Sequence, residues 1–148
     1  MYEVAKYEVS RDSDMKELKG DKFYKLHLPP KIPVKEFWSV LVFNAKTHLL
    51  IKNEMPWPSV NAVQKELVFS EDGSVEIYFG PKPIIMKINW IQTIPKQKWY
   101  LVLNLYEPLE TWFDKTWKPG EIENLYNNQK FTKNETSLIK FRHTDEAL

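Results

Sequence analysis

Tryptophan is the residue type whose number and spacing in this sequence point most directly to binding chemistry. Six tryptophans occur in 148 residues, and four of them lie in the stretch from Ile88 to Trp117. An indole offers a large apolar face and one N–H donor, so it suits a site for a small molecule or a sugar ring. The same density also suits the core of a β-sandwich with few glycines, and the sequence leaves both interpretations open.

The candidate binding residues are aromatic and amide side chains near turns or proline-rich segments. Trp57 is flanked by two prolines, Pro56 and Pro58, neither of which can donate a backbone hydrogen bond. A tryptophan held in this way suits a ligand platform, and it equally suits a loop that plugs the end of a sandwich. The full set of candidates is Trp38, Trp57, Asn89, Trp90, Tyr106, Trp112 and Trp117.

Carboxylates near the aromatic stretch are the alternative source of chemistry. Hydrolysis of a glycosidic bond needs two carboxyl groups in distinct roles, so a hydrolase acting on a sugar or an ester is an alternative function. Carboxylates in such numbers are also common on an ordinary solvated surface. The sequence therefore assigns no catalytic residue. The carboxylates in question are Glu107, Glu110, Asp114, Glu121 and Glu123.

The other reactive residue types are absent or poorly spaced. The chain has no cysteine, which excludes disulfides, Cys-ligated zinc and thiol catalysis from within it. His27, His48 and His143 lie far apart without a metal-ligand spacing. Asp12 and Asp14 begin a loop that lacks the glycine and glutamate of a calcium-binding loop. The sequence therefore predicts no metal and no cofactor.

The charge balance gives no general attraction to polyanions. Lys plus Arg number 21 and Asp plus Glu number 20, so no nucleic-acid partner is predicted. No stretch approaches the roughly 20 apolar residues of a membrane-spanning helix. The first residues, MYEVAKYEVSRDSDMK, lack the apolar run of a signal peptide. Compartment and oligomeric state stay open.

Alternating apolar residues predict the strands that must position these side chains. Tyr2 to Val9 and Phe23 to Leu28 have this alternation. Phe37 to Phe43 is apolar on both faces apart from Ser39, which is typical of a central strand covered on both sides. A second inner strand is predicted from Trp99 to Tyr106, with one face formed by Trp99, Leu101, Leu103 and Leu105.

Turn residues predict how these strands are connected. Asp72 and Gly73 lie between Leu67 to Phe69 and Val75 to Phe79, which indicates a hairpin. Ile84 to Ile88 is expected to be extended. Pro108 ends the strand, and a short helical turn is expected from Leu109 to Lys115, with Trp112 and Phe113 packing inward.

The number of strands determines the predicted fold class. About seven or eight short strands without a long helical period favour an all-β fold, specifically an antiparallel jelly-roll-like β-sandwich with one or two short helices. The sandwich domain is expected over residues 1–123. A polar C-terminal tail over residues 124–148 follows, and the sequence leaves its order open.

Five segments together carry a resemblance to a known family. They are AKYEVSRDSD, LKGDKFYKLHLPP, PVKEFWSVLVFNAKT, EDGSVEIYFGPKP and NWIQTIPKQKWYLVLNLYEPLETWFDKTWKPGEIE. In this order and spacing, from about Ala5 to Glu123, the chain resembles the DUF1214 domain. That domain is commonly the C-terminal part of proteins that also carry a DUF1254 domain.

The resemblance implies a jelly-roll-like β-sandwich and no established reaction, cofactor or catalytic residue. It also implies a DUF1254-like partner in the same or a neighbouring chain, and relatives often look exported. Relatives usually have an arginine where Asn104 stands and a glycine-containing turn where Lys96 to Lys98 stand, so a binding role that depends on that arginine does not carry over. The expected function is a non-catalytic ligand-binding or accessory domain for a carbohydrate or small molecule.

Overall fold

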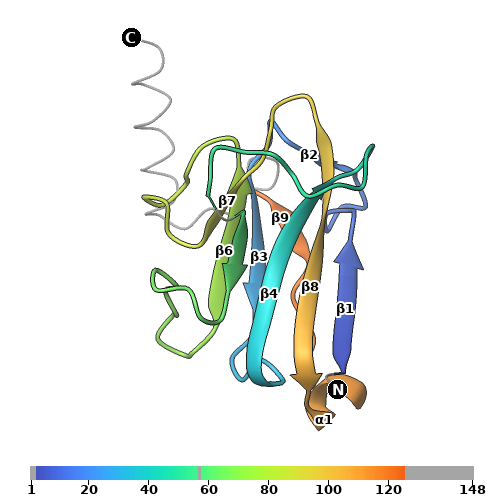
Figure 1. Cartoon of the computed structure of the whole chain (residues 1–148), viewed down its shortest axis with the longest axis vertical. Helices are drawn as coiled ribbons and strands as arrows, with labels where there is room; N and C mark the ends of the chain where they lie inside the picture. The colour runs from blue at the N-terminus through green and yellow to red at the C-terminus, as the bar shows by residue number, and fades with distance from the viewer. Residues whose placement is uncertain (1–2, 57, 126–148) are drawn as a thin grey trace.

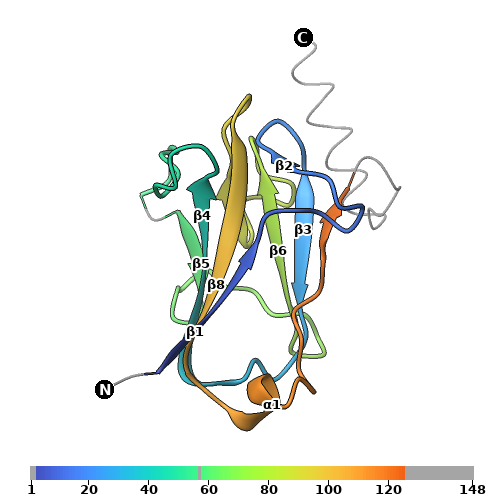
Figure 2. The ribbon, with the colours of Figure 1, turned by 90° about the vertical axis from the view of Figure 1, so that its right-hand side faces the viewer.

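The computed structural model describes residues 3–56 and 58–125. They form two β-sheets that lie face to face, with one short helix at one end (Figures 1 and 2). In Figure 2 the sheet that contains β4 and β8 lies on the left, and the sheet that contains β3 and β6 lies on the right. The prediction of a mostly β sandwich with a short helix is confirmed.

The first sheet is built on its two longest strands, β4 (Val34–Asn44) and β8 (Lys98–Pro108). They pair antiparallel along most of their length, with a bulge between Val34 and Phe37. The sheet has the order β1-β8-β4-β5, and β2 also pairs with β8. The shorter strands are β1 (Val4–Val9), β2 (Leu18–Lys19) and β5 (Ser59–Asn61).

The second sheet has the order β7-β6-β3-β9. Its strands are β3 (Tyr24–Leu28), β6 (Val75–Gly80), β7 (Trp90–Gln92) and β9 (Ile122–Asn124). β3 pairs antiparallel with β6 and β9, but β6 and β7 are parallel. The prediction of antiparallel pairing therefore does not hold for β6 and β7. The connection over residues 81–89 carries the chain back along β6, so β7 runs in the same direction as β6.

The hydrophobic core lies between the two sheets. The inward residues of β8 are almost completely buried, as their alternation predicts, and residues of β3 and β6 face them. Burying one large aliphatic side chain contributes roughly 1.5–3 kcal/mol. The facing core side chains are Trp99, Leu101, Leu103 and Leu105 from the first sheet and Leu26, Leu28, Ile77 and Phe79 from the second.

Two connections differ from the sequence-based expectation. A turn forms around Gly73, which has φ 89°, but Leu67 to Phe69 is not a strand. β6 pairs with β3 and β7 instead. Packing between residues far apart in the chain, and not the adjacent turn, determines these partners. Ile84 to Ile88 is not extended, since Met86 and Lys87 have φ values of 44° and 63°.

The predicted short helix forms as α1 (Glu110–Phe113), and it lies at one end of the sandwich (Figure 2). The Trp112 ring packs edge-on against Tyr7, with centroids 6.0 Å apart. The prediction that Phe113 also packs inward is wrong, because its side chain points to solvent and is 55% exposed. Within the described residues, no helix has the length and apolar character needed to cross a membrane.

The described part of the sandwich continues through β9. Leu125 is fully buried and packs with Tyr78 and Trp90 on the outer side of the second sheet. Residues 126–148, which make up most of the predicted tail, lie outside the described residues.

Candidate functional site

A cleft of about 580 Å³ opens on the outer side of the second sheet, beside β7. This volume lies in the range typical of small-molecule sites. Apolar and proline side chains form most of its walls, and two ammonium groups and one carboxylate supply charge. The described residues that line it are Glu54, Met55, Pro56, Pro81, Lys82, Pro83, Lys87, Trp90 and Gln92.

Trp90 reaches this cleft because of the register of β7. It pairs with Tyr78, whereas the next residue, Ile91, pairs with the core residue Phe79. Successive side chains of a strand point to opposite faces, so Trp90 points outward. Its Nε1 donates to the Gly80 carbonyl at 3.0 Å. The indole N–H is thus satisfied within the protein, and the ring contributes apolar surface to the cleft.

Gln92 ties the two walls of the cleft together. Its Nε2 donates to the Pro81 carbonyl at 3.3 Å, and its Oε1 accepts from the Glu54 N–H at 2.8 Å. Asn53 adds a second tie, because its Nδ2 donates to the Gln92 carbonyl and its Oδ1 accepts from the Met55 N–H, both at 2.9 Å. The cleft is therefore preformed, which lowers the entropy lost when a ligand binds.

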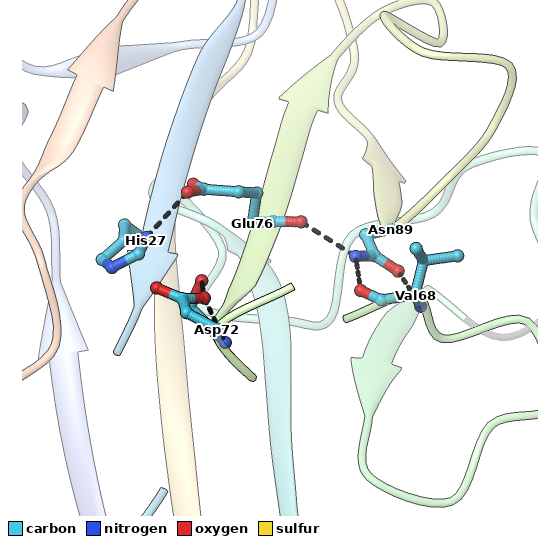
Figure 3. A network of polar contacts seen from close by, with 6 residues as sticks. His27, Val68, Asp72, Glu76 and Asn89 are labelled. Atoms are coloured by element: carbon cyan, nitrogen blue, oxygen red, sulfur yellow. Dashed lines mark hydrogen bonds and ion pairs between the residues drawn. The ribbon is translucent and has the colours of Figure 1, made fainter. Parts of the chain in front are cut away.

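Asn89 holds the backbone immediately before Trp90. Its side chain accepts from the Val68 N–H at 3.0 Å and donates to the carbonyls of Val68 and Glu76 at 2.8 Å and 3.0 Å (Figure 3). Its φ of 45° lies in a region that asparagine adopts more readily than most residues. All of these contacts go to backbone groups, so Asn89 positions the cleft wall from beneath.

The connection over residues 81–89 combines unusual backbone geometry with firm anchoring. Met86, Lys87 and Asn89 have positive φ values of 44°, 63° and 45°. Such residues persist only when their surroundings fix them, and they occur often at binding sites. Here the buried side chains of Ile84 and Asn89 supply the anchors. This geometry sets the position of Lys87 on the cleft.

A carboxylate–imidazole pair lies on the same outer face (Figure 3). His27 and Glu76 are direct partners in the β3–β6 register, and Nδ1 of His27 donates to Oε1 of Glu76 at 2.7 Å. The other oxygen, Oε2, is buried and has no hydrogen-bond partner in the described part of the chain. Sequence reasoning missed this pair. The outward positions in each strand could have suggested it only once the pairing of β3 with β6 was known.

Asp72 lies close to this pair in the turn before β6 (Figure 3). Hydrogen bonds from the Ser74 hydroxyl and N–H, at 2.6 Å and 2.9 Å, hold the pKa of Asp72 below its usual value. The nearby His27 lowers this pKa further. Across residues 3–56 and 58–125, no three His, Asp or Glu side chains gather in a way that could hold a metal ion.

The outer face of the first sheet is open, and it carries apolar side chains of β4 and β8 with polar side chains of β1 and β5 at its edges. Figure 1 looks onto this face, with β4 and β8 in front. Phe37 packs on Tyr106 and Phe43 packs on Tyr100, with ring centroids 5.1 Å and 5.4 Å apart. Within each pair the rings cover part of each other's surface, but all four side chains remain half-buried. The prediction that β4 is covered on both sides is therefore wrong for the described residues.

Asn104 lies in the middle of this open face. It is 4% exposed, and its Nδ2 donates to Ser39 Oγ at a long 3.4 Å. Its Oδ1 is buried and accepts no hydrogen bond from the described residues. A buried acceptor left in this state costs about 1–3 kcal/mol. This part of the surface thus combines apolar side chains with an unsatisfied polar atom.

The other predicted binding residues do not gather at the cleft. Trp38 is buried in the core, and Tyr106 lies on the open face of the first sheet. Trp112 and Trp117 do lie together, with ring centroids 6.4 Å apart, but Trp112 belongs to α1, which lies away from β7 in Figure 1. Trp57 lies outside the described residues. Of the predicted set, Trp90 lines the cleft.

The predicted hydrolytic carboxylates are distributed over several surface positions. Glu107 shares a depression of about 150 Å³ with Glu36. Glu110 begins α1. Asp114 accepts from the Thr116 hydroxyl and N–H at 2.6 Å and 2.9 Å, and these bonds lower its pKa. A lowered pKa favours the ionised form and does not suit a general acid.

Comparison with known families identifies the chain. The family model described as "Protein of unknown function (DUF1214)" matches residues 3–110. The chain belongs to the DUF1214 family. The matched part of this DUF1214 domain contains both long strands and every residue named above as lining the Trp90 cleft. None of the curated proteins compared with the chain matches it.

Two solved structures are similar to this DUF1214 domain. The VPA0106 protein from Vibrio parahaemolyticus has 22% sequence identity and a TM-score of 0.69, over 82% of this chain and 30% of that chain. A putative uncharacterized protein from Burkholderia cenocepacia has 17% identity and a TM-score of 0.48, over 95% of this chain and 34% of that chain. The DUF1214 domain thus spans about a third of each. At 22% identity, the similarity to VPA0106 shows a shared fold.

Proposed function

We propose that this DUF1214 domain is a non-catalytic ligand-binding domain whose ligand, a carbohydrate or another small ring-bearing molecule, lies against Trp90. The observation that carries this proposal is the preformed cleft of about 580 Å³ around that indole. The Trp90 side chain is 8% exposed and packs with Tyr78 and Leu125, so only the small part of its ring that lines the cleft is left for apolar contact with a ligand. Proline walls on both sides keep the hollow open to a rigid ligand.

The described lining of the cleft supports binding more than catalysis. It contains one carboxylate, Glu54, and two amines, Lys82 and Lys87, but no histidine, serine or cysteine. Hydrolysis of a glycosidic bond requires two carboxyl groups. The Gln92 amide is engaged in holding the walls. The charged groups are therefore the ones expected to select among ligands.

Titration of a panel of sugars and small metabolites, followed by intrinsic tryptophan fluorescence, tests this proposal. At least one compound should give a saturable change with the wild-type chain. Trp90→Phe should weaken that binding at least about tenfold, because the larger indole surface is lost. Trp112→Phe is the matched control and should bind normally, since Trp112 belongs to α1 and does not line the cleft. Either no saturable response in the wild type or the same loss in both variants would argue against the cleft.

A second variant separates binding from folding. Trp90→Phe also removes the hydrogen bond to Gly80, so it could lose affinity by loosening the sheet. Lys87 is exposed and lines the cleft, so Lys87→Gln should leave the free energy of unfolding unchanged. It should weaken binding of acidic members of the panel more than that of neutral members. An unchanged preference for charge would place the ligand away from Lys87.

A second candidate function is supported by the open face of the first sheet. We infer that this face docks a DUF1254-like domain in the same or a neighbouring chain. Its half-buried rings offer apolar area, and Asn104 Oδ1 lacks a donor within the described residues. In VPA0106 the similar region is 30% of the chain, so that protein has further polypeptide available to cover such a face.

Calorimetric titration with a separately produced DUF1254-like domain tests the docking role. Leu41→Asp places a charge on the half-buried surface of β4 and should weaken association at least about tenfold. Lys65→Asp, an exposed loop change between β5 and β6, should not. Docking elsewhere would be indicated if both variants bound like the wild type.

The hydrolase alternative stays a prediction. It is tested by an amide series, Glu107→Gln, Glu110→Gln, Asp114→Asn and Glu121→Gln, assayed on any sugar or ester that the protein is found to turn over. Activity that survives all of these changes would exclude these carboxylates as the acid and base.

A further inference from the structure

A second hollow, separate from the Trp90 cleft, lies under the segment from Arg11 to Lys22. It has a volume of about 500 Å³ and shares no described lining residue with the cleft. Tyr24 and Asn124, at the ends of two neighbouring strands, also line it. The hollow is large enough for a sugar-sized molecule with an attached charged group.

Positive charge dominates this hollow. Its cationic lining side chains are Arg11, Lys16, Lys19 and Lys22, against two carboxylates, Asp12 and Glu17. No hydrogen bond or ion pair with another described residue occupies the ammonium groups of the three lysines. These groups are thus available to an anion.

Both carboxylates are already engaged by the protein. Asp12 is 4% exposed, and its Oδ1 accepts from the N–H groups of Asp14 and Lys16 at 2.8 Å and 3.0 Å. Glu17 Oε1 accepts from Lys98 Nζ at 3.1 Å, and this contact lowers the pKa of Glu17. Among the described residues, Glu17 forms its ion pair with Lys98, and Arg11 and Lys19 act on it only as weaker charge attractions that also lower its pKa.

The segment from Arg11 to Lys22, which carries these cations, is hydrogen-bonded to the sandwich at several points. The Ser13 N–H donates to the Ile122 carbonyl at 2.8 Å. The Gly20 N–H donates to the Gln97 carbonyl at 2.8 Å, and the Gly20 carbonyl accepts from Thr93 Oγ1 at 2.7 Å. A side chain at position 20 would collide with the chain, since an added Cβ would lie 1.7 Å from the nearest backbone oxygen. The backbone of the segment is therefore fixed, and the exposed lysine side chains extend from fixed points around the hollow.

Tyr24 adds a neutral donor to the hollow. Its hydroxyl oxygen accepts from the Lys19 N–H at 2.9 Å, and no hydrogen bond between described residues uses the hydroxyl proton. Burial raises the pKa of Tyr24 to about 12, so the hydroxyl keeps this proton at neutral pH. An oxyanion in the hollow would thus meet both ammonium groups and an O–H donor.

We propose that this hollow binds a phosphate monoester of a small metabolite, with the phosphate held by Lys16, Lys19 and Lys22. A doubly charged tetrahedral oxyanion matches several separate ammonium donors, and charge-assisted hydrogen bonds are the strong ones. The remaining volume accommodates the esterified ring. This site is independent of the Trp90 cleft, so either one can exist without the other.

NMR titration of the full chain in about 0.15 M salt, where weak surface attraction is screened, tests this site. The probes are inorganic phosphate, glucose 6-phosphate, glucose and inorganic sulfate. Glucose 6-phosphate should give saturable shifts of the backbone amides from Arg11 to Tyr24, and glucose should give none in this segment. Saturation by sulfate with the same affinity would overturn the preference for a phosphate monoester, and shifts that never saturate would overturn the site itself.

Charge-neutralising variants locate the site. Lys16→Gln and Lys22→Gln should each weaken glucose 6-phosphate binding by about fivefold. Lys35→Gln, an exposed change on β4, is the matched control and should bind normally. Because all three side chains are exposed, the variants should fold normally, which circular dichroism would check. Equal weakening by all three variants would show general charge attraction and would contradict a built site.

Discussion

Two buried asparagines show how differently the two sheets treat their outer faces. Asn89 and Asn104 are each 4% exposed. Asn89, beside the second sheet, makes three side-chain hydrogen bonds to the backbone and holds the connection that forms the Trp90 cleft. Asn104, on the first sheet, makes one long hydrogen bond and leaves its Oδ1 without a described partner.

The two residues differ in how the fold treats a buried amide: the hydrogen bonds of Asn89 are satisfied within the chain, whereas Asn104 keeps an unsatisfied oxygen. A satisfied buried amide stabilises the conformation around it, whereas an unsatisfied one is a cost that a further molecule could remove. The second sheet is covered by its own chain, and this cover creates a cleft of small-molecule size. The first sheet is open, and its apolar face suits a larger partner.

The largest expected effect is the loss of folding stability when a leucine on the inner face of the first sheet is truncated, compared with one on its outer face. Leu103→Ala should reduce the free energy of unfolding by about 3 kcal/mol, because the site is 1% exposed in the core. Leu41→Ala, on the half-buried outer face, should cost about 1 kcal/mol. Urea denaturation of both variants measures the difference. Equal losses would mean that the outer face is covered in solution.

Asn89 variants test the covered side. Asn89→Ala should reduce the free energy of unfolding by about 2 kcal/mol, because three side-chain hydrogen bonds are lost and alanine disfavours a φ of 45°. Asn89→Gly loses the same bonds but accepts this φ, so it should be milder by about 1 kcal/mol. Chemical denaturation measures both. If both variants were as stable as the wild type, Asn89 would not be the anchor of the cleft wall.

Asn104→Leu tests the open outer face of the first sheet, and here the expected change is a gain in stability. Replacing the unsatisfied amide with an apolar side chain should raise the free energy of unfolding of the isolated chain by about 1 kcal/mol. Ligand binding at the Trp90 cleft should not change. A destabilised Asn104→Leu variant would indicate that the amide is satisfied in solution, for example by a buried water.

The smallest expected effect concerns acid stability next to β6. The pKa of Asp72 is lowered chiefly by the Ser74 hydroxyl. Its ionisation therefore stabilises the fold above the unfolded value of about 3.9, and this contribution is lost as the pH falls through the lower folded pKa. Ser74→Ala should raise the pKa of Asp72 in a carboxyl NMR titration and leave that of Asp114 unchanged. No movement of the Asp72 pKa would exclude Ser74 as its main cause.

The sequence predicted the faces that local alternation controls. The inward residues of β3, β6 and β8 follow a period of two, and the core forms where this period places them. The short helix after Pro108 was also predictable, because the proline ends the strand. These features depend on residues close together in the chain.

The cleft itself could not be predicted from local pattern. The parallel pairing of β6 and β7 brings residues 81–87 and 90–92 together, and hydrogen bonds to Gln92 hold residues 54–56 against them. Met86 and Lys87 have positive φ values although neither is a glycine, so their residue types do not indicate this backbone conformation. Trp90 was predicted from tryptophan density, but neither Met55 nor Gln92 was. The contact of His27 with Glu76 spans 49 residues and depends on the same sheet pairing.

Fluorine NMR of the chain labelled with 5-fluorotryptophan tests the ligand-binding proposal most directly. The six tryptophans should give separate resonances, and the one lost in Trp90→Phe identifies Trp90. We expect a ligand from the sugar and metabolite panel to shift the Trp90 resonance saturably while the core residue Trp99 stays unchanged. A saturable shift at Trp112 or Trp117 without one at Trp90, or no shift with any member of the panel, would contradict ligand binding in the Trp90 cleft.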